Sequence, residues 1–186
     1  VNAAGPAHLA EACRNARIRL IHFSTDYVFD GEKHGEYDEC DAANPLNVYG
    51  RSKLEGEMAV LETLVDAVVL RVSFLFGPGR TTFLDKIAAR ARAPGQPIAV
   101  LDGWTSKPTA TAEIVRAVEH VMTSDVTGLW HLAGAPAVSR LGFAREVLRI
   151  LGEDPARAVP LPPERLVLPA RRPASPPSKS STTRAV

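Results

Sequence analysis

The 186-residue sequence has few cysteines, little net charge and no long apolar run, and each shortage excludes a class of protein. Cys13 and Cys40 are too few for a disulfide scaffold and do not form a metal-binding motif. The formal net charge of +1 excludes a strongly basic nucleic-acid binder. No apolar stretch reaches the roughly 20 residues of a membrane-spanning helix. We therefore expect a reducing, cytoplasmic setting, with neither nucleic acid nor membrane as a partner.

The start of the sequence lacks two further features. Residues 1–5 contain no basic segment followed by an apolar one, so no secretory signal is predicted there. The first residue is Val rather than Met, and it lies at the edge of a predicted helix with no strand before it. This start indicates a trimmed chain, a fragment or a misplaced start of translation.

The sequence does contain enough apolar residues, 45%, to form a folded core. Its length fits one domain of roughly 100–200 residues. Residues 1–172 are predicted to form this domain. Residues 173–186 are rich in Pro, Ser and Thr, and we expect a disordered tail there.

Apolar periodicity predicts strands and helices that alternate along the chain. Apolar runs predict strands at residues 18–23, 67–76, 97–101 and 128–133. Helical spacing predicts helices at residues 3–16, 48–64, 82–92, 111–122 and 140–151. This alternation is typical of βαβ units, so it predicts an α/β fold with a parallel sheet.

Polar residues or a proline precede three of these helices as candidate first residues or N-caps. Pro45 or Asn47 is expected to open the second helix, and Ser139 the fifth. Thr109 or Thr111 is expected to cap the fourth.

Tyr49 and Lys53 could carry acid–base chemistry at the start of the second helix. A spacing of four places both side chains on one helix face. A tyrosine hydroxyl, with a reference pKa of about 10, is a poor proton donor or acceptor near neutrality unless a nearby cation lowers that pKa. Such a pair can exchange a proton with a carbonyl or an alcohol. The alternative is an exposed helix face on which the two residues have no chemical role.

Ser24 and Thr25 follow the first predicted strand, and ligands of open α/β sheets bind beyond the carboxyl ends of strands. The Thr25 hydroxyl could therefore donate a hydrogen bond to a substrate carbonyl beside the Tyr49 hydroxyl. The alternative is that these residues only form a turn together with Asp26.

Two longer strings surround these residues. They are Ser-Thr-Asp-Tyr-Val-Phe-Asp-Gly at 24–31 and Asn-Pro-Leu-Asn-Val-Tyr-Gly-Arg-Ser-Lys at 44–53. Together they resemble the dTDP-4-dehydrorhamnose reductases, members of the extended short-chain dehydrogenase/reductase superfamily. The resemblance covers most of residues 1–173. It implies a partial Rossmann-like, doubly wound parallel sheet with a small C-terminal substrate-binding lobe.

The resemblance also implies a reaction, in which NADPH or NADH reduces the C4 keto group of a nucleotide sugar, dTDP-4-dehydro-L-rhamnose, to give dTDP-L-rhamnose. Tyr49 would donate the proton, Thr25 would orient the carbonyl, and Lys53 would hold the nicotinamide ribose. The remaining assignments are Ser24 and Asn2 on the cofactor side, and Tyr27, Phe74 and Arg80 on the substrate side. Phe74 stands where the family usually has Trp, and Arg80 could meet a substrate diphosphate.

The sequence departs from the family in one major way, because no Gly-x-x-Gly-x-x-Gly occurs in it. The family carries this phosphate-binding loop on its first strand and helix, and such a loop is what binds a dinucleotide pyrophosphate. We therefore expect a truncated chain with little or no activity alone. Two smaller departures are the loop at 102–107 and the segment at 174–186, which lose the family pattern.

Several alternatives stay open at this point. The acidic loop residues Asp38, Glu39 and Asp41 could bind Mg²⁺ at a homodimer contact, as members of the resembling family can, although a solvated loop is the simpler interpretation. No spacing in the sequence predicts a protein-bound metal site. The chain could also be a non-catalytic regulatory or scaffolding subunit, or an epimerase or dehydratase of nucleotide sugars within the same superfamily.

Overall fold

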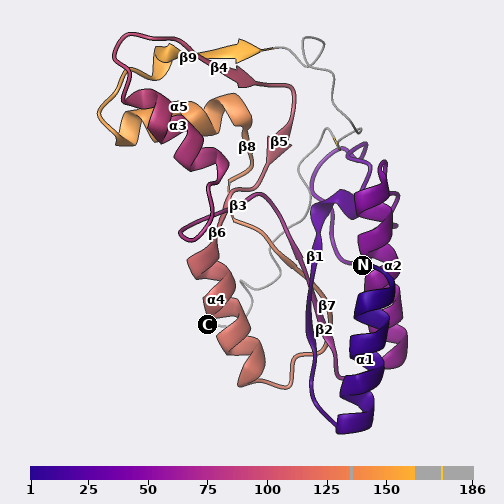
Figure 1. Ribbon diagram of the computed structural model, residues 1–186. Helices are drawn as coiled ribbons and strands as arrows, with labels where there is room; N and C mark the ends of the chain where they lie inside the picture. Colours follow the sequence, from indigo (N-terminus) through magenta and orange to yellow (C-terminus); the bar gives the residue numbers. More distant parts are fainter. Residues whose placement is uncertain (135, 162–172, 174–186) are drawn as a thin grey trace.

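The computed structural model describes residues 1–134, 136–161 and 173. Its centre is a parallel sheet of three strands, β1 (Ile21–Thr25), β2 (Val68–Val72) and β7 (Gly128–Leu132), in the order β1-β2-β7. Helices α1 (Ala4–Ala16) and α2 (Val48–Thr63) cover one face, and α4 (Thr111–Met122) covers the other (Figure 1). The predicted doubly wound α/β sheet is therefore confirmed.

The apolar pattern of the central strand explains the two helical layers. Alternate residues of a strand point to opposite faces. Val69 packs with Ala10 and Val60 from the α1 and α2 layer, whereas Val68 and Leu70 pack with α4 on the other face. Burial on both sides is why this strand reads as a nearly continuous apolar run.

A smaller lobe lies beyond the carboxyl ends of the strands (Figure 1). It contains α3 (Phe83–Ala91) and α5 (Arg140–Ile150), together with the parallel pair β4 (Ile98–Leu101) and β9 (Ala158–Leu161). The antiparallel pair β5 (Thr105–Ser106) and β8 (Val138–Ser139) lies at its base. Its own core includes Ile87, Val100 and Leu148. The lobe thus draws on residues 83–101 as well as on the more C-terminal residues.

The single strand predicted at 67–76 is wrong, because the chain breaks into two strands. After β2 it turns at Phe74, whose φ angle of 35° lies in the left-handed region. The next strand, β3 (Leu75–Phe76), pairs with β6 (Thr109–Ala110) in a separate two-stranded sheet. Left-handed backbone costs a residue with a side chain about 1–2 kcal/mol, so tertiary contacts of Phe74 must hold this turn.

Other predicted boundaries differ by a few residues. Strand β1 begins at Ile21 rather than at residue 18, and it includes Ser24 and Thr25. Helix α4 takes neither threonine as its N-cap. Its N-cap is Ala110, whose backbone N–H donates to the Glu113 carboxylate. The N-caps Asn47 and Ser139 are confirmed, because their side chains accept from Gly50 and Gly142 N–H groups.

Of the tail predicted at 173–186, residues 174–186 lie outside the described residues. Within the described part of the chain, no helix is long and apolar enough to cross a bilayer.

Helix α2 approaches the segment after β1 closely enough to exclude a side chain. Gly50 lies in the first turn of α2, and a Cβ atom there would be 2.1 Å from the backbone oxygen of Tyr27. Glycine is therefore needed at this position for steric reasons. The contact fixes the start of α2 against the 3₁₀ turn η1 (Asp26–Val28).

We predict that Gly50→Ala lowers the free energy of unfolding by about 1–3 kcal/mol, because backbone must move to admit the methyl group. Gly5→Ala is the matched control, since a Cβ on this helical glycine of α1 would meet no atom within 4 Å. It should raise stability by up to about 1 kcal/mol through helix propensity. Urea unfolding of both variants tests the contrast, and equal effects would contradict the close approach.

Candidate active site

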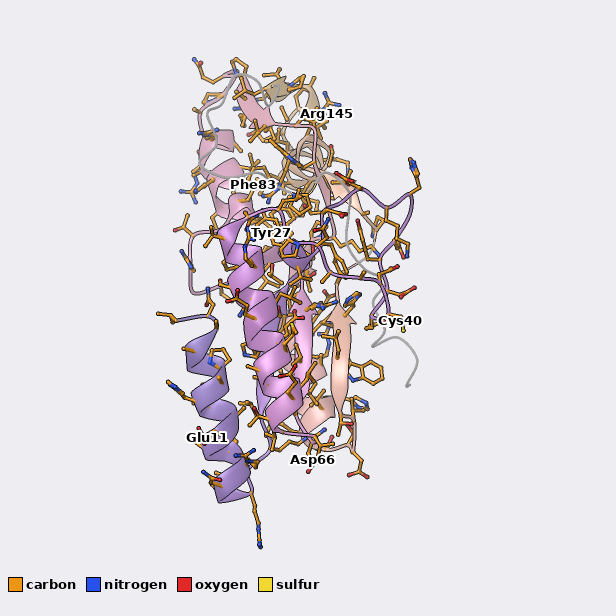
Figure 2. All side chains as sticks on the ribbon, turned by 90° about the vertical axis from the view of Figure 1, so that its right-hand side faces the viewer. Glu11, Tyr27, Cys40, Asp66, Phe83 and Arg145 are labelled. Atoms are coloured by element: carbon orange, nitrogen blue, oxygen red, sulfur yellow. The ribbon has the colours of Figure 1, made fainter. Side chains whose placement is uncertain are left out.

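A small pocket of about 240 Å³ lies where the sheet meets the lobe. Ser24 and Thr25 contribute the end of β1, and Tyr27 the following turn. Tyr49 enters from α2, and Phe74 from the turn after β2. Figure 2 shows Tyr27 at this junction, with Phe83 of the lobe above it. Five of the eight residues predicted for the site therefore line one pocket.

Tyr49 and Lys53 lie one turn apart on α2, as predicted. The Tyr49 side chain is 48% exposed. Its ring meets the Tyr27 ring edge-on, with 5.9 Å between centroids. Lys53 Nζ donates to the backbone oxygen of Phe23 in β1. Burial lowers the pKa of Lys53, and the nearby Glu57 carboxylate partly opposes this.

Asp26 organises the hydroxyl groups at the end of β1. The Thr25 hydroxyl donates to Asp26 Oδ1 at 3.0 Å, and the Ser73 hydroxyl donates to Asp26 Oδ2 at 2.8 Å. Thr25 Oγ1 also accepts from the Tyr27 N–H at 3.3 Å. Desolvation raises the pKa of the Asp26 carboxyl, against the effects of its two hydroxyl donors and of Arg140.

Asp26 is a residue that sequence reasoning assigned only to a turn. The signal that could have identified it is an acidic side chain directly after a strand, at the edge where open α/β sheets bind ligands. The turn that was predicted does exist as η1, and the role of Thr25 toward a substrate stays a prediction.

Phe74 is held in the pocket by aromatic and cationic neighbours. The Arg140 guanidinium lies 3.6 Å from the centroid of the Phe74 ring, an attractive cation–π arrangement. Phe143 and Phe83 contact the same ring, with centroids 5.2 and 5.8 Å away. These contacts account for the left-handed backbone at Phe74. Arg140 itself lines the pocket and was not predicted.

Ser24, Asn2 and Arg80 lie in three different environments. Ser24 is 3% exposed, and its hydroxyl has no hydrogen-bond partner among the described residues. Asn2 lies beside α2 instead, where its amide donates to Ser52 Oγ at 3.3 Å. Arg80 lines a separate, shallow cavity on the turn between β3 and α3. The roles assigned to these three, and to the other five predicted residues, stay predictions.

The acidic loop that could have bound Mg²⁺ makes other contacts. Asp41 pairs with Lys33, and the Glu39 carboxylate accepts the backbone N–H of His131 at 2.8 Å. Over the described ranges, no group of three or more His, Cys, Asp or Glu side chains could hold a metal ion. The structure thus gives the magnesium prediction no support.

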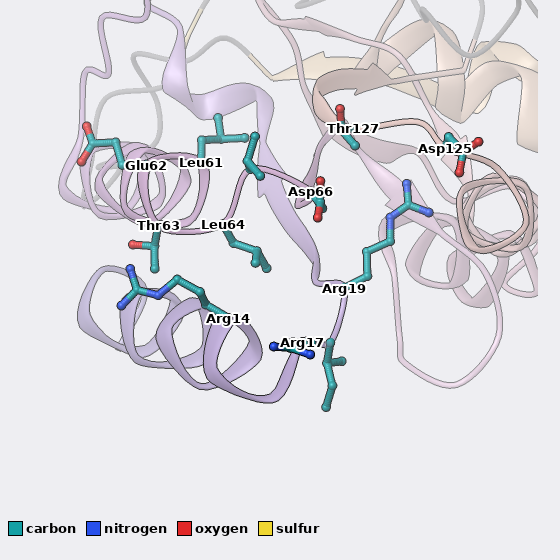
Figure 3. Close-up of a pocket in the computed structure, with 12 residues that line it drawn as sticks. Arg14, Arg17, Arg19, Leu61, Glu62, Thr63, Leu64, Asp66, Asp125 and Thr127 are labelled. Carbon is teal, nitrogen blue, oxygen red and sulfur yellow. The ribbon is translucent and has the colours of Figure 1, made fainter.

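A larger cavity, of about 980 Å³, lies at the opposite ends of the strands (Figure 3). Arg14, Arg17 and Arg19 are among the residues that line it. Arg19 points toward α4, where its guanidinium donates to the backbone oxygens of Val121 and Ser124, both at 2.6 Å. This arginine therefore ties β1 to the end of α4. None of the predicted site residues lies in this cavity.

Residues 1–185 match the protein family described as "RmlD substrate binding domain". The chain belongs to this family. It is 39% identical over 177 residues to a dTDP-4-dehydrorhamnose reductase of Mycobacterium tuberculosis, and 35% identical over 167 residues to a dTDP-4-keto-6-deoxy-D-glucose reductase of Streptomyces niveus. These alignments cover 92% and 89% of this chain but 58% of each relative.

Solved structures of the family have the same fold. The dTDP-4-dehydrorhamnose reductase of Bacillus anthracis, in complex with NADP, matches with a TM-score of 0.93 at 26% identity. The match covers 99% of this chain and 65% of that protein. A dTDP-4-dehydrorhamnose reductase from Clostridium acetobutylicum matches with a TM-score of 0.90 at 30% identity, over 97% of this chain and 63% of that one. This RmlD-family chain thus spans about three fifths of the length of these relatives.

We predict that the Asp26→Asn variant becomes more stable than the original protein as pH rises. A carboxyl group whose pKa is raised on folding binds its proton more tightly in the folded state, so its ionisation destabilises that state. The deficit that Asp26 ionisation causes in the original protein should be absent below the pKa of Asp26 in the unfolded state. It should grow as pH rises through the pKa of Asp26 in the folded state. Urea unfolding at several pH values tests this, and a constant difference between the two proteins would contradict it.

Proposed function

We propose that this chain forms the proton-donating and substrate-binding part of an NADPH-dependent reductase of dTDP-linked 4-keto-6-deoxysugars. The observation that carries the proposal is that Thr25, Tyr27 and Tyr49 line one pocket at the carboxyl end of β1. Family membership and the printed activities of the two curated relatives support the substrate class. dTDP-4-dehydro-L-rhamnose is the substrate we favour.

Tyr49 would donate the proton to the C4 oxygen. Its side chain is half exposed and lines the pocket, so a ligand there can reach it. Lys53 lies one turn further along the same helix face, and its positive charge would favour the phenolate left after the proton has moved. The Phe23 carbonyl holds the Lys53 ammonium beside the end of β1. Lys53 would thus stabilise the charge that forms on Tyr49.

Thr25 and Tyr27 would position the sugar. The Thr25 hydroxyl oxygen is held between Asp26 and the Tyr27 N–H, so its position is fixed before substrate binds. Its single proton, donated to Asp26 in this structure, would turn to the C4 oxygen when substrate is bound. A donor whose oxygen is already in place loses little freedom when it binds the substrate. Phe74, stacked with Arg140, would give the pocket an aromatic wall and a cation for the nucleotide part.

NADPH, when bound, would supply the hydride for C4. The residues present fit the nicotinamide and ribose end of this cofactor, because Ser24 carries a buried hydroxyl without a partner among the described residues beside Tyr49. Lys53 Nζ donates one hydrogen bond to a backbone carbonyl, and an ammonium group has three N–H donors, so it could also meet a ribose hydroxyl. The sequence supplies no Gly-x-x-Gly-x-x-Gly for the pyrophosphate.

We predict that Tyr49→Phe in the whole gene product lowers kcat by about 10²–10⁴-fold, the usual contribution of a positioned acid. The substrate affinity should change little, because the ring remains. The measurement is NADPH oxidation with a dTDP-4-keto-6-deoxysugar. Unchanged turnover would overturn the role of Tyr49.

Tyr37→Phe is the matched control for loss of a tyrosine hydroxyl. Tyr37 lies outside the pocket, and its hydroxyl donates to Asp30 at 2.6 Å. Its removal should affect stability and leave kcat unchanged. If the original protein binds neither NADPH nor the sugar nucleotide but forms a stable complex with another enzyme, the regulatory-subunit alternative replaces this proposal.

A further inference from the structure

A buried ion pair connects the central strand to the helix that carries Tyr49 and Lys53. Arg71 of β2 is 5% exposed and Glu57 of α2 is 2% exposed. Arg71 Nε donates to the two Glu57 carboxylate oxygens at 3.0 and 3.1 Å, and Arg71 Nη2 donates to Oε2 at 2.7 Å. Two nitrogens of the planar guanidinium thus bind the carboxylate and hold it in one orientation.

Two further groups contact the Arg71 guanidinium. The Phe29 ring centroid lies 5.0 Å from the guanidinium carbon. His131 of β7, which is fully buried, lies 3.5 Å from Arg71 Nη1 through its Nε2 atom. Burial lowers the pKa of His131 to about 4, so its ring is neutral near pH 7 and does not repel the arginine. The direction of Arg71 is therefore fixed by Glu57 of α2, by His131 of β7 and by Phe29, which follows η1.

Glu57 follows Lys53 by one helical turn, and Lys53 follows Tyr49 by one turn. Residues four apart lie on one helix face, so a glutamate here could pair with the lysine. The structure has a different arrangement, in which the Glu57 carboxylate is bound to Arg71 and Lys53 Nζ donates to the Phe23 carbonyl. His22 of β1, whose pKa is lowered by burial and by Lys53, is another titratable group near this lysine.

We propose that Arg71 is a positioning residue: by holding Glu57 against the sheet, it keeps that carboxylate from pairing with Lys53 and fixes the helix face that carries Tyr49. The inference deepens the proposed function, on which the roles of Lys53 and Tyr49 rest. A buried ion pair is weak evidence for a stability role, because apolar residues of similar volume often serve as well. The position of this pair, one turn from Lys53, points to a role in setting the charge on the helix face.

The test follows the titration of Lys53 itself by NMR of ¹³C-labelled lysine ε-carbons, with the resonance assigned through Lys53→Arg. In Arg71→Met, the released Glu57 carboxylate should turn to Lys53 and shift its titration to higher pH. In Arg71→Met/Glu57→Gln, the carboxylate is gone and the upward shift should disappear. A merely structural role of Arg71 would not produce a shift that the second substitution removes. Arg71→Lys, which keeps the positive charge, separates release of Glu57 from loss of that charge. The readout needs no turnover, so it is independent of whether the proposed function holds.

Arg19→Met is the control for general loss of an arginine that makes several hydrogen bonds, because Arg19 binds carbonyls at the other end of the sheet. It should lower stability without moving the Lys53 titration. Arg71→Lys, which also serves if Arg71→Met does not fold, keeps the positive charge but loses the bidentate contact with Glu57. A smaller upward shift of the Lys53 titration is expected for it. A folded Arg71→Met or Arg71→Lys with an unshifted Lys53 titration would overturn the proposal.

Discussion

The geometry of the candidate site depends on how closely α2 approaches the segment after β1. Gly50 allows the helix to lie against the Tyr27 carbonyl, where any larger residue would collide with backbone. Asn47 starts the helix in the same place by accepting the Gly50 N–H. From that start, the helical repeat alone places Tyr49 beside Tyr27, and Lys53 beside the Phe23 carbonyl. One contact between backbones therefore sets the distances of several side chains.

The elements that could be predicted from the sequence are those with a strong local signal. The helices over 4–16 and 48–63 have apolar spacing and clear boundaries, and both were found within a residue. The cluster around Thr25 and Tyr49 followed from strand ends and from family motifs. The break at Phe74 could not be predicted, because the backbone turn is held by Arg140 and Phe143, which lie more than 60 residues further along the sequence.

Charged residues inside predicted apolar elements were the signal that sequence reasoning left unused. Arg71 interrupts a buried strand, and Glu57 lies on the face of α2 that turns toward the sheet. Either charge alone would be costly to bury, so each one indicates that a partner exists elsewhere. The partner itself cannot be read from the sequence, because it is set by the register of β2 against the helix. Asp26 is a similar case, since its two hydroxyl donors come from different strand ends.

The lobe is built from segments on both sides of β7 in the sequence, and this affects the order of folding during synthesis. Helix α3 and strand β4 leave the ribosome before β7, but they pack against α5 and β9, which follow β7. The three-stranded sheet can therefore close while half of the lobe still lacks its apolar partners. During that interval the apolar side of α3, including Ile87, has no cover from α5. The lobe can therefore complete its core only after α5 and β9 have been synthesised.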